Sequence, residues 1–344
     1  MRAHLPISKA FVKLGNYLTD FCENDKDSFS SFNETLVRAE QQNGWFTREN
    51  IIFALRQWSK LLTDENLSQW LSKYDFQVDN APKVIGIVMA GNIPLVGFHD
   101  LLCVLLSGNK VLAKLSSNDK VLLPFLADYL IQQEPLLAER IEFTEGKLEN
   151  FDAVIATGSN NTGRYFEYYF GKKPNIIRKN RSSVAILTGN ESNSELEALG
   201  EDIFRYYGLG CRNVSKIFVP QGYDFDAFYK AVFKFQDVIH QHKYANNYDY
   251  NKAVYLMSDF KILDNGFLVL KEDEGFSSPI AALFYSRYDS LEKLRNQLSE
   301  QEEQIQCVVS GEAQSGEVIF GDTQKPRLDD YADGVDTLEF LLQL

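Results

Sequence analysis

The chain has 344 residues, of which 44% are hydrophobic and 24% are charged, so it is long enough to bury a core and to form two domains. Its formal net charge of −13 argues against a nucleic-acid-binding surface but leaves room for a local basic pocket. The four cysteines form no CxxC pair and stand far from the four histidines. The sequence therefore predicts neither a metal site nor a disulfide framework.

The first 80 residues are predicted to be helical, because apolar residues such as Phe11, Leu14 and Leu18 recur at helical spacing. This region carries no catalytic motif. The N-terminal stretch lacks the apolar core of a signal peptide. The longest apolar stretch, around residues 95–106, is interrupted by His99 and Asp100 and is shorter than the roughly 20 residues of a spanning helix. We therefore expect a cytoplasmic protein without a membrane span.

After residue 82 the pattern changes to alternating strands and helices. The apolar run 83–89 predicts a buried strand that ends in a loop at residues 90–94. Further strands are predicted at residues 110–114, 153–156, 184–188 and 216–219, with amphipathic helices between them. This alternation favours an α/β fold with a largely parallel sheet that is covered on both faces.

Three of the predicted strands border loops rich in small residues, and ligands bind at the carboxyl ends of strands in open α/β sheets. The first loop, MAGNIP (residues 89–94), has the composition of a turn, in which Gly91 and Asn92 accept a positive φ and Pro94 opens the next helix. The second contains Gly158 and Ser159 before a predicted helix, whose first N–H groups offer a seat for a phosphate. The third, residues 206–220, contains Cys211.

Cys211 differs from the other cysteines in its setting. A single cysteine is most often a small buried hydrophobe, and Cys22, Cys103 and Cys307 lie in apolar helical or strand-like segments that fit this role. Gly208 and Gly210 allow a close backbone approach at Cys211, and Arg212 favours a thiolate. A strand follows directly. We therefore expect Cys211 to be the cysteine that is exposed on a loop.

The order of these loops resembles the aldehyde dehydrogenase superfamily: Asn-x-Pro after a strand, then GNKVLAKLSS, ATGSNNTGR and GLGCRNVSKIFVP. The short chain, the GxCRN form of the cysteine loop and the ending FGDTQKPRLDDYADGVDTLEFL look most like the LuxC-type fatty acyl-CoA reductases. Beyond the helical region at 1–80, which the apolar spacing predicts, the resemblance implies a Rossmann-type cofactor domain at 81–190 and an α/β catalytic domain at 191–325. A tail at 326–344 would pack back on the cofactor domain or at an oligomer interface.

The resemblance also implies a role for each matching residue. Cys211 would be the nucleophile that takes the acyl group from an acyl-CoA thioester, and Asn92 would stabilise the oxyanion together with the backbone N–H of Cys211. Lys114 matches the lysine that holds the adenosine ribose of the cofactor. The position three residues later is often glutamate in NAD-specific members and is Ser117 here, so we expect NADPH.

The remaining implications concern the pyrophosphate and the partners. Gly158 and Ser159 match the turn beneath the cofactor pyrophosphate. The product would be an aldehyde and the protein would form a homo-oligomer. A partner enzyme that donates the acyl group is an alternative to acyl-CoA as the acyl donor.

Two departures from the superfamily pattern affect the predicted chemistry. Residues 177–186 offer no acid where aldehyde-oxidising members carry the glutamate that activates water. Glu274 stands in a segment whose spacing differs by one from the family's Glu-x-Phe-Gly-Pro, so it is given no role. Aldehyde oxidation, acyl-phosphate reduction and a non-catalytic scaffold remain open as alternatives.

Two further patterns have competing interpretations. Five cations gather within residues 172–181 and could bind the phosphates of CoA or NADPH, although a solvated turn is favoured: Lys172, Lys173, Arg178, Lys179 and Arg181. The aromatic run at residues 164–170 could line an acyl channel, but its helical spacing favours a core and an interface.

Overall fold

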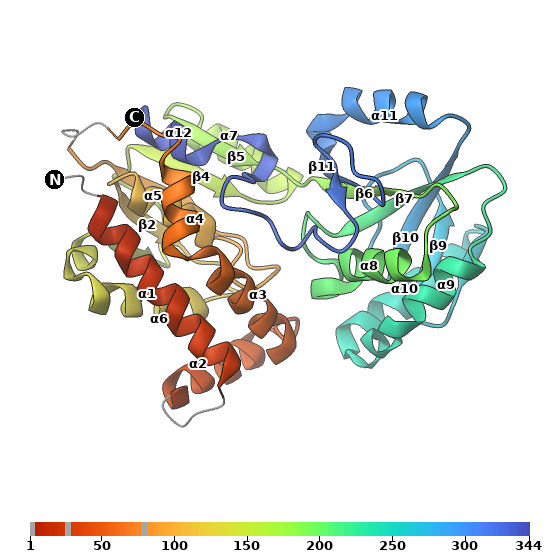
Figure 1. The fold of residues 1–344 in the computed structure, drawn as a ribbon, viewed down its shortest axis with the longest axis horizontal. Coiled ribbons are helices and arrows are strands. Elements are labelled where there is room, and N and C mark those ends of the chain that lie inside the picture. The colour runs from red at the N-terminus through yellow and green to blue at the C-terminus, as the bar shows by residue number, and fades with distance from the viewer. Residues whose placement is uncertain (1–3, 25–28, 77–80) are drawn as a thin grey trace. The chain divides into compact units, whose positions relative to one another are not determined.

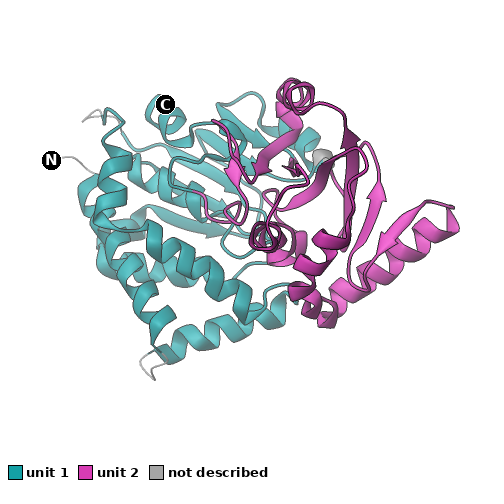
Figure 2. Ribbon diagram, turned by 45° about the vertical axis from the view of Figure 1, so that its right-hand side comes forward, with its two compact units in different colours: residues 1–179, 327–344 teal, residues 180–326 magenta. Residues whose placement is uncertain are grey.

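The computed structural model describes residues 4–24, 29–76 and 81–344. The chain forms two compact units (Figure 2). Residues 1–179 and 327–344 make up the first unit, and residues 180–326 make up the second. The chain thus leaves the first unit after residue 179 and returns to it at residue 327. Each unit contains its own β-sheet (Figure 1).

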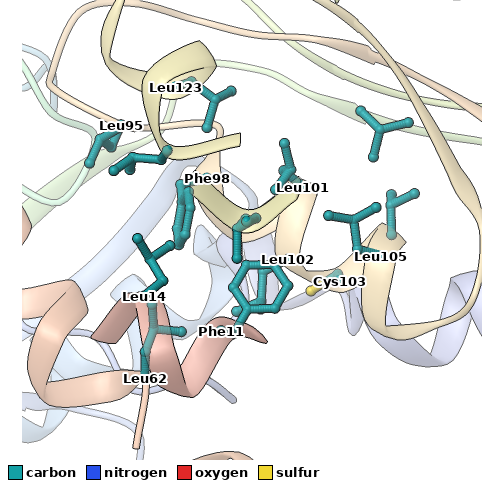
Figure 3. Packing of buried hydrophobic residues seen from close by; sticks show 14 of the residues in the cluster. Phe11, Leu14, Leu62, Leu95, Phe98, Leu101, Leu102, Cys103, Leu105 and Leu123 are labelled. Atoms are coloured by element: carbon teal, nitrogen blue, oxygen red, sulfur yellow. The ribbon is translucent and has the colours of Figure 1, made fainter. Parts of the chain in front are cut away.

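The first unit begins with helices, which confirms the helical N-terminal region: α1 (His4–Glu23), α2 (Ser30–Gln42), α3 (Arg48–Leu61) and α4 (Asp64–Leu71). Thr47 and Thr63 cap α3 and α4, because each side chain accepts a hydrogen bond from the backbone N–H three residues later. The apolar faces of these helices share one hydrophobic core with the first sheet. In Figure 3, Phe11 and Leu14 of α1 lie against Phe98 and Leu102.

The first sheet has the strand order β3-β2-β1-β4-β5, and each neighbouring pair is parallel. The chain builds the sheet outward from β1 to β3 and then continues on the other side of β1, so the order reverses between β1 and β4. Ligands bind at such a reversal in open α/β sheets. The elements are β1 (Val84–Val88), α5 (Phe98–Leu106), β2 (Lys110–Lys114), α6 (Leu122–Gln133), η2 (Pro135–Glu139), β3 (Ile141–Thr144), β4 (Ala153–Thr157), α7 (Asn160–Phe170) and β5 (Asn175–Arg178).

The second sheet has the order β12-β11-β6-β7-β10-β9-β8, and only the β8–β9 pair is antiparallel among the described residues. Leu294 and Leu298 pack on Val184, Ile186 and Phe218, so α11 covers β6 and β7 on one face. The elements are β6 (Ser182–Ile186), α8 (Asn193–Phe204), η3 (Arg205–Gly208), β7 (Val214–Pro220), α9 (Asp226–Val232), η4 (Phe233–His240), α10 (His242–Met257), β8 (Ile262–Asp264), β9 (Val269–Glu272), β10 (Ala282–Tyr288), α11 (Leu291–Glu300), η5 (Glu302–Gln304), β11 (Ile305–Ser310) and β12 (Val318–Ile319).

The C-terminal segment, with η6 (Ala332–Gly334) and α12 (Thr337–Leu342), belongs to the first unit. The indole N–H of Trp70 donates to the Tyr331 hydroxyl at 2.9 Å, and the Tyr74 hydroxyl donates to Asp336 at 2.7 Å. His99 hydrogen-bonds the backbone carbonyl of Leu328 at 2.9 Å, and burial lowers the pKa of His99. The tail is therefore held by partly buried polar contacts as well as by apolar packing.

The division between the units falls at residue 179, whereas we expected the cofactor domain to extend to residue 190. The difference arises from β6, which pairs with β7 and β11 of the second sheet. The segment expected as the last strand of the cofactor domain is thus the first strand of the second unit.

Candidate active site

Several predicted site residues lie at the carboxyl edge of the first sheet. Val88, the last residue of β1, is paired with Lys114 of β2 and with Ala156 of β4. The loops that follow these three strands therefore leave the sheet side by side. They contain Asn92, Ser117, Gly158 and Ser159. Because the strand order reverses between β1 and β4, these residues surround the place where this type of sheet binds ligands.

The loop after β1 packs directly on the loop after β2. A Cβ atom added at Gly91 would lie 2.4 Å from Oγ and 2.6 Å from Cβ of Ser116, and rotation of the serine side chain would not relieve the second contact. Asn92 is half-buried. The residue with positive φ is Leu95 (φ 59°) rather than Gly91 or Asn92, and α5 begins at Phe98 instead of at Pro94. The predicted turn chemistry of this loop was wrong, since Gly91 is required for close packing.

A buried carboxylate joins the same two loops. Oδ2 of Asp119 accepts a hydrogen bond from the backbone N–H of Leu95 at 3.3 Å. Burial raises the pKa of Asp119 to about 6, although hydrogen bonds from the backbones of Leu95 and Leu122 act in the opposite direction. Asp119 thereby fixes the loop that carries Asn92 to the loop that carries Ser117. No local sequence pattern marks Asp119 as a buried residue.

Lys114 and Ser117 lie at the end of β2 and in the loop after it. Lys114 is half-buried and Ser117 is exposed. The backbone carbonyl of Lys114 accepts a hydrogen bond from the N–H of Met89 at 3.1 Å, which extends the pairing of β1 and β2 by one residue. A cation at the strand end is thus followed, three residues later, by an exposed hydroxyl.

The turn after β4 begins α7. Ser159 caps the helix, since its Oγ accepts a hydrogen bond from the N–H of Thr162 at 3.2 Å. The N–H of Gly158 donates to the carbonyl of Arg178 at 3.3 Å. A Cβ atom at Gly158 would lie 2.9 Å from the ring of Phe166 and 3.0 Å from Cβ of Thr162. Glycine therefore allows the turn to lie directly against the first turns of α7.

Cys211 lies in the second unit, in the turn between η3 and β7, and its side chain is exposed. Cys103 and Cys307 are buried and Cys22 is half-buried. Burial raises the pKa of Cys103 well above its ordinary value and also raises that of Cys22. Cys211 is thus the cysteine that the described structure exposes to a reactant, as the sequence predicts.

The backbone before Cys211 has an unusual conformation. Tyr206, Tyr207 and Gly208 have φ values of 54°, 58° and 75°, and only glycine adopts this left-handed region without strain. Tyr206 is buried, so packing holds the strained residues in place. Gly208 matches the predicted need for a flexible residue, but the two tyrosines were not anticipated.

Asn213 fixes the shape of the cysteine loop from the side of β7. Its Oδ1 accepts from the N–H of Gly210 at 2.8 Å, and its Nδ2 donates to the carbonyls of Arg205 at 2.7 Å and Asp202 at 2.9 Å. The hydroxyl of Ser183 donates to the carbonyl of Cys211 at 2.9 Å. The loop is therefore held by hydrogen bonds to α8, to β6 and between Asn213 and Gly210 within the loop.

A second buried carboxylate supports this loop from behind. Asp202 is fully buried and accepts hydrogen bonds from the N–H of Gly321 at 2.6 Å and from the hydroxyl of Thr323 at 2.8 Å. Burial raises its pKa to about 6. Nε of Arg212 donates to the carbonyl of Thr323 at 2.5 Å. The segment at residues 320–323 thus connects α8 to the residue that follows Cys211.

The basic cluster of residues 172–181 does not form one patch. Arg178 is 6% exposed and forms an ion pair with Asp100 at 2.7 Å. The other contacts are with separate groups: Lys173 with the Phe151 carbonyl, Lys179 with Glu167 and Arg181 with the Glu302 carbonyl. Arg178 is therefore part of the core of the first unit, in contrast to both interpretations of the sequence.

The aromatic run on α7 divides between core and surface. Phe166 and Phe170 pack against the cluster of Phe151, Val154 and Ala156. Tyr165, Tyr168 and Tyr169 are 66%, 81% and 69% exposed. Phe166 and Phe170 thus pack in the core, as their helical spacing predicts.

Within residues 4–24, 29–76 and 81–344, no helix is both long enough and apolar enough to cross a membrane. These residues also contain no group of three or more His, Cys, Asp or Glu side chains that could hold a metal ion.

Solved structures with a similar fold are aldehyde dehydrogenases and related enzymes. An indole-3-acetaldehyde dehydrogenase complexed with NAD+ superposes with a TM-score of 0.65 at 13% identity, over 90% of this chain and 72% of the other. Aldehyde dehydrogenase 21 from Physcomitrella patens, complexed with succinate, has a TM-score of 0.68 at 12% identity, over 100% and 84%. An NADP-dependent enzyme from E. coli has a TM-score of 0.63 at 12% identity, over 90% and 73%.

At these identities the likeness establishes the fold, which is aldehyde dehydrogenase-like. The chain has no sequence match among curated proteins. The family described as "Acyl-CoA reductase (LuxC)" matches residues 16–234, which is more than half of the chain. The match includes every predicted site residue, from Asn92 to Cys211. The chain therefore belongs to the LuxC family of acyl-CoA reductases.

Proposed function

We propose that the protein reduces an acyl-CoA thioester, with a fatty acyl-CoA as the substrate, to an aldehyde with NADPH through a thioester on Cys211. The observation that carries the proposal is the exposed Cys211 in a loop whose shape is fixed by Asn213 and Ser183. A nucleophile needs an exposed thiol at a constrained position. Membership of the LuxC family supports the choice of an acyl-CoA as the acyl donor.

The first unit has groups that suit a nicotinamide dinucleotide. Gly158 and the Ser159-capped start of α7 offer backbone N–H groups to a pyrophosphate. Lys114 supplies a cation at the end of the neighbouring β2, with the hydroxyl of Ser117 exposed beyond it. Enzymes of the same fold have been crystallised with NAD+. When bound, the reduced nicotinamide would supply the hydride that converts the acyl group into an aldehyde.

Cys211 performs the covalent part of the proposed reaction. Its thiolate attacks the carbonyl carbon of the thioester, a new bond forms from carbon to Sγ, and CoA leaves as a thiolate that takes up a proton. The family resemblance assigns stabilisation of the oxyanion of this step to the amide of Asn92 and the N–H of Cys211. Cys211 is also the leaving group when the aldehyde departs. The overall change is acyl-CoA, NADPH and a proton to aldehyde, CoA and NADP+.

The proposal predicts that water removes the acyl group slowly. Residues 177–186 contain no carboxylate, so this segment supplies no general base to activate water. General-base assistance contributes about 10²–10⁴ in rate. Without a base at this position, the acyl-enzyme should persist until hydride or CoA discharges it.

The test is to load the protein with radiolabelled acyl-CoA, remove the excess and follow the label with and without NADPH. We expect label on Cys211 by mass spectrometry, release as aldehyde when NADPH is added and little free fatty acid without it. Cys211→Ala should abolish labelling, whereas the buried Cys307→Ala should retain it.

Other outcomes point to the alternative functions. Rapid release of free fatty acid without reductant would move the protein toward aldehyde oxidation or thioester hydrolysis. Labelling from an acyl phosphate but not from acyl-CoA would make it an acyl-phosphate reductase. Absence of both labelling and NADPH binding would favour a non-catalytic scaffold and would refute the proposal.

The preference for NADPH rests on Ser117. A carboxylate at this position would repel the 2′-phosphate, whereas the hydroxyl can donate a hydrogen bond to a phosphate oxygen and Lys114 offers a counter-charge. Ser117→Glu should lower the ratio of kcat/KM for NADPH to that for NADH by about tenfold or more. Ser117→Gln, which adds similar size without charge, serves as the control. Equal use of both cofactors by the unmodified protein would contradict this assignment.

A further inference from the structure

A small cavity lies in the second unit beside the start of β7. Its volume is about 250 Å³, and its lining includes Lys216, Phe218, Glu274, Phe276 and Gln301. Lys216 is the third residue of β7 and lies five residues after Cys211. Five residues of extended chain span at most about 17 Å. The cavity and the proposed nucleophile therefore belong to the same end of β7.

Two serines connect the cavity wall to the cysteine loop. The hydroxyl of Ser183 donates to the carbonyl of Cys211 at 2.9 Å. The hydroxyl of Ser215 lies 3.5 Å from the carbonyl of Ser183 and 2.7 Å from that of Phe276, which lines the cavity. A short chain of polar contacts thus fixes the position of the cavity relative to Cys211.

Lys216 brings an ammonium group to this cavity. The residue is 1% exposed, and its Nζ donates to the carbonyl of Asp273 at 2.8 Å. An ammonium has three donors, and Asp273 provides its hydrogen-bond acceptor within the described chain. Nζ also lies 4.9 Å from the ring centre of Phe218 and 5.5 Å from that of Phe276. Burial lowers the pKa of Lys216, whereas Glu274 and Asp273 raise it.

Gln301 offers a hydrogen-bond acceptor, whereas Lys216 offers donors. Its Oε1 is buried and has no hydrogen-bond partner among the described residues. A buried acceptor without a donor costs about 1–3 kcal/mol. Because Lys216 and Glu274 bring opposite charges, the cavity suits a neutral ligand. Such a ligand would accept a hydrogen bond from Lys216, donate one to Gln301 and lie against an aromatic ring.

A secondary amide has these properties, since it is neutral and planar and has one C=O acceptor and one N–H donor. We propose that this cavity binds an amide of the pantetheine-type arm that leaves from Cys211 during acylation, with Lys216 as donor and Gln301 as acceptor. The inference rests on the proposed function, because it assigns a subsite for the thiol portion of that substrate. It makes Lys216 and Gln301 recognition residues for the CoA arm.

The test compares two unreactive ligands, S-ethyl pantetheine and its analogue in which the amide N–H nearest the sulfur is replaced by an ester oxygen, by titration calorimetry. The same replacement is made in the octanoyl thioester of N-acetylcysteamine to measure acylation of Cys211. The unmodified protein should prefer the amide about tenfold in both measurements, which is the usual cost of one lost hydrogen bond. Gln301→Leu should reduce this preference to near one.

The chain offers matched controls for both variants. Gln306 also has a buried Oε1 without a partner in the described structure, but it does not line the cavity. Gln306→Leu should keep the preference for the amide. Lys216→Met should weaken binding of both ligands by about 10- to 100-fold, because a charged hydrogen bond is lost. Lys271 binds the carboxylate of the same Asp273 and is also outside the cavity, so Lys271→Met should leave binding unchanged.

The two measurements separate the subsite from the proposed reaction. Acylation without any preference for the amide would overturn the subsite and leave the proposed function standing. Retention of the preference in Gln301→Leu would also overturn it. Amide-selective binding without acylation by any thioester would support the subsite and refute the proposed reductase.

Discussion

Asn92 lies in a loop whose backbone is closely packed before it and hydrogen-bonded after it. Gly91 before it lies against Ser116, and the backbone of Leu95 after it is bonded to the buried Asp119. An oxyanion donor is useful only if its position is set before the charge develops. The packing around Asn92 is consistent with this requirement.

Asn92→Ala should therefore lower the rate of acylation by about 10²–10³, the usual cost of one oxyanion donor. The measurement is single-turnover acylation with acyl-CoA. Asn190→Ala, which alters an exposed asparagine of the second unit, should have no such effect. A change of less than about threefold in Asn92→Ala would remove this side chain from the mechanism.

The loops after β1 and β2 behave as one structural element because Asp119 joins them. The pKa of Asp119 is about 6 in the folded protein, above its ordinary value of 3.8. A carboxyl group with a raised pKa contributes stability that is fully present below pH 3.8 and is lost as the pH rises through about 6. The expected loss is about 3 kcal/mol for a shift of this size.

Asp119→Asn should accordingly flatten the decline of unfolding free energy between about pH 4 and pH 7, measured by urea unfolding at a series of pH values. Asp202, whose pKa is also raised to about 6, should retain its own contribution. Asp128→Asn changes an exposed carboxylate and should leave the slope unaltered. If unfolding free energy depended on pH in the same way in Asp119→Asn and in the unmodified protein, this carboxyl group would not titrate in that range.

The first unit of the molecule is closed by a segment from the far end of the chain. Arg178 of β5 binds Asp100 of α5 at 2.7 Å and Thr337 of α12 at 3.0 Å. The side chains of Arg178 and Asp100 are only 8% and 6% exposed. Removal of one partner from a buried ion pair leaves an uncompensated charge, which costs about 3–5 kcal/mol.

Arg178→Met should therefore lower the free energy of urea unfolding by about 3–5 kcal/mol. The neighbouring Lys179 is 49% exposed in its ion pair with Glu167, and Lys179→Met should cost less than about 1 kcal/mol. The additional change Asp100→Leu should recover part of the loss in Arg178→Met. Equal stability of the two single variants would contradict a structural role for Arg178.

Local sequence was sufficient to predict the strands β1, β2, β4, β6 and β7 and the exposed cysteine, but not the other strands. Residues 110–114 form β2 as predicted. A short apolar run between turn-forming residues is typical of a buried strand. Gly208 and the following strand likewise identified the loop of Cys211. These features depend on residues within a few positions of one another, so their pattern can be read along the chain.

Contacts between distant residues were decided by the tertiary structure. Arg178 lies in a run of cations, yet it is buried by Asp100 and Thr337, which are 78 and 159 positions away. Lys216 and Gln301 have ordinary local settings, and only the packing of η5, α11 and the loop after β9 brings them to one cavity. Burial and hydrogen-bond partners change the energy of a polar side chain far more than its neighbours in sequence do. For this reason the sequence determined where the candidate site loops lie, while the tertiary structure determined which polar groups are buried.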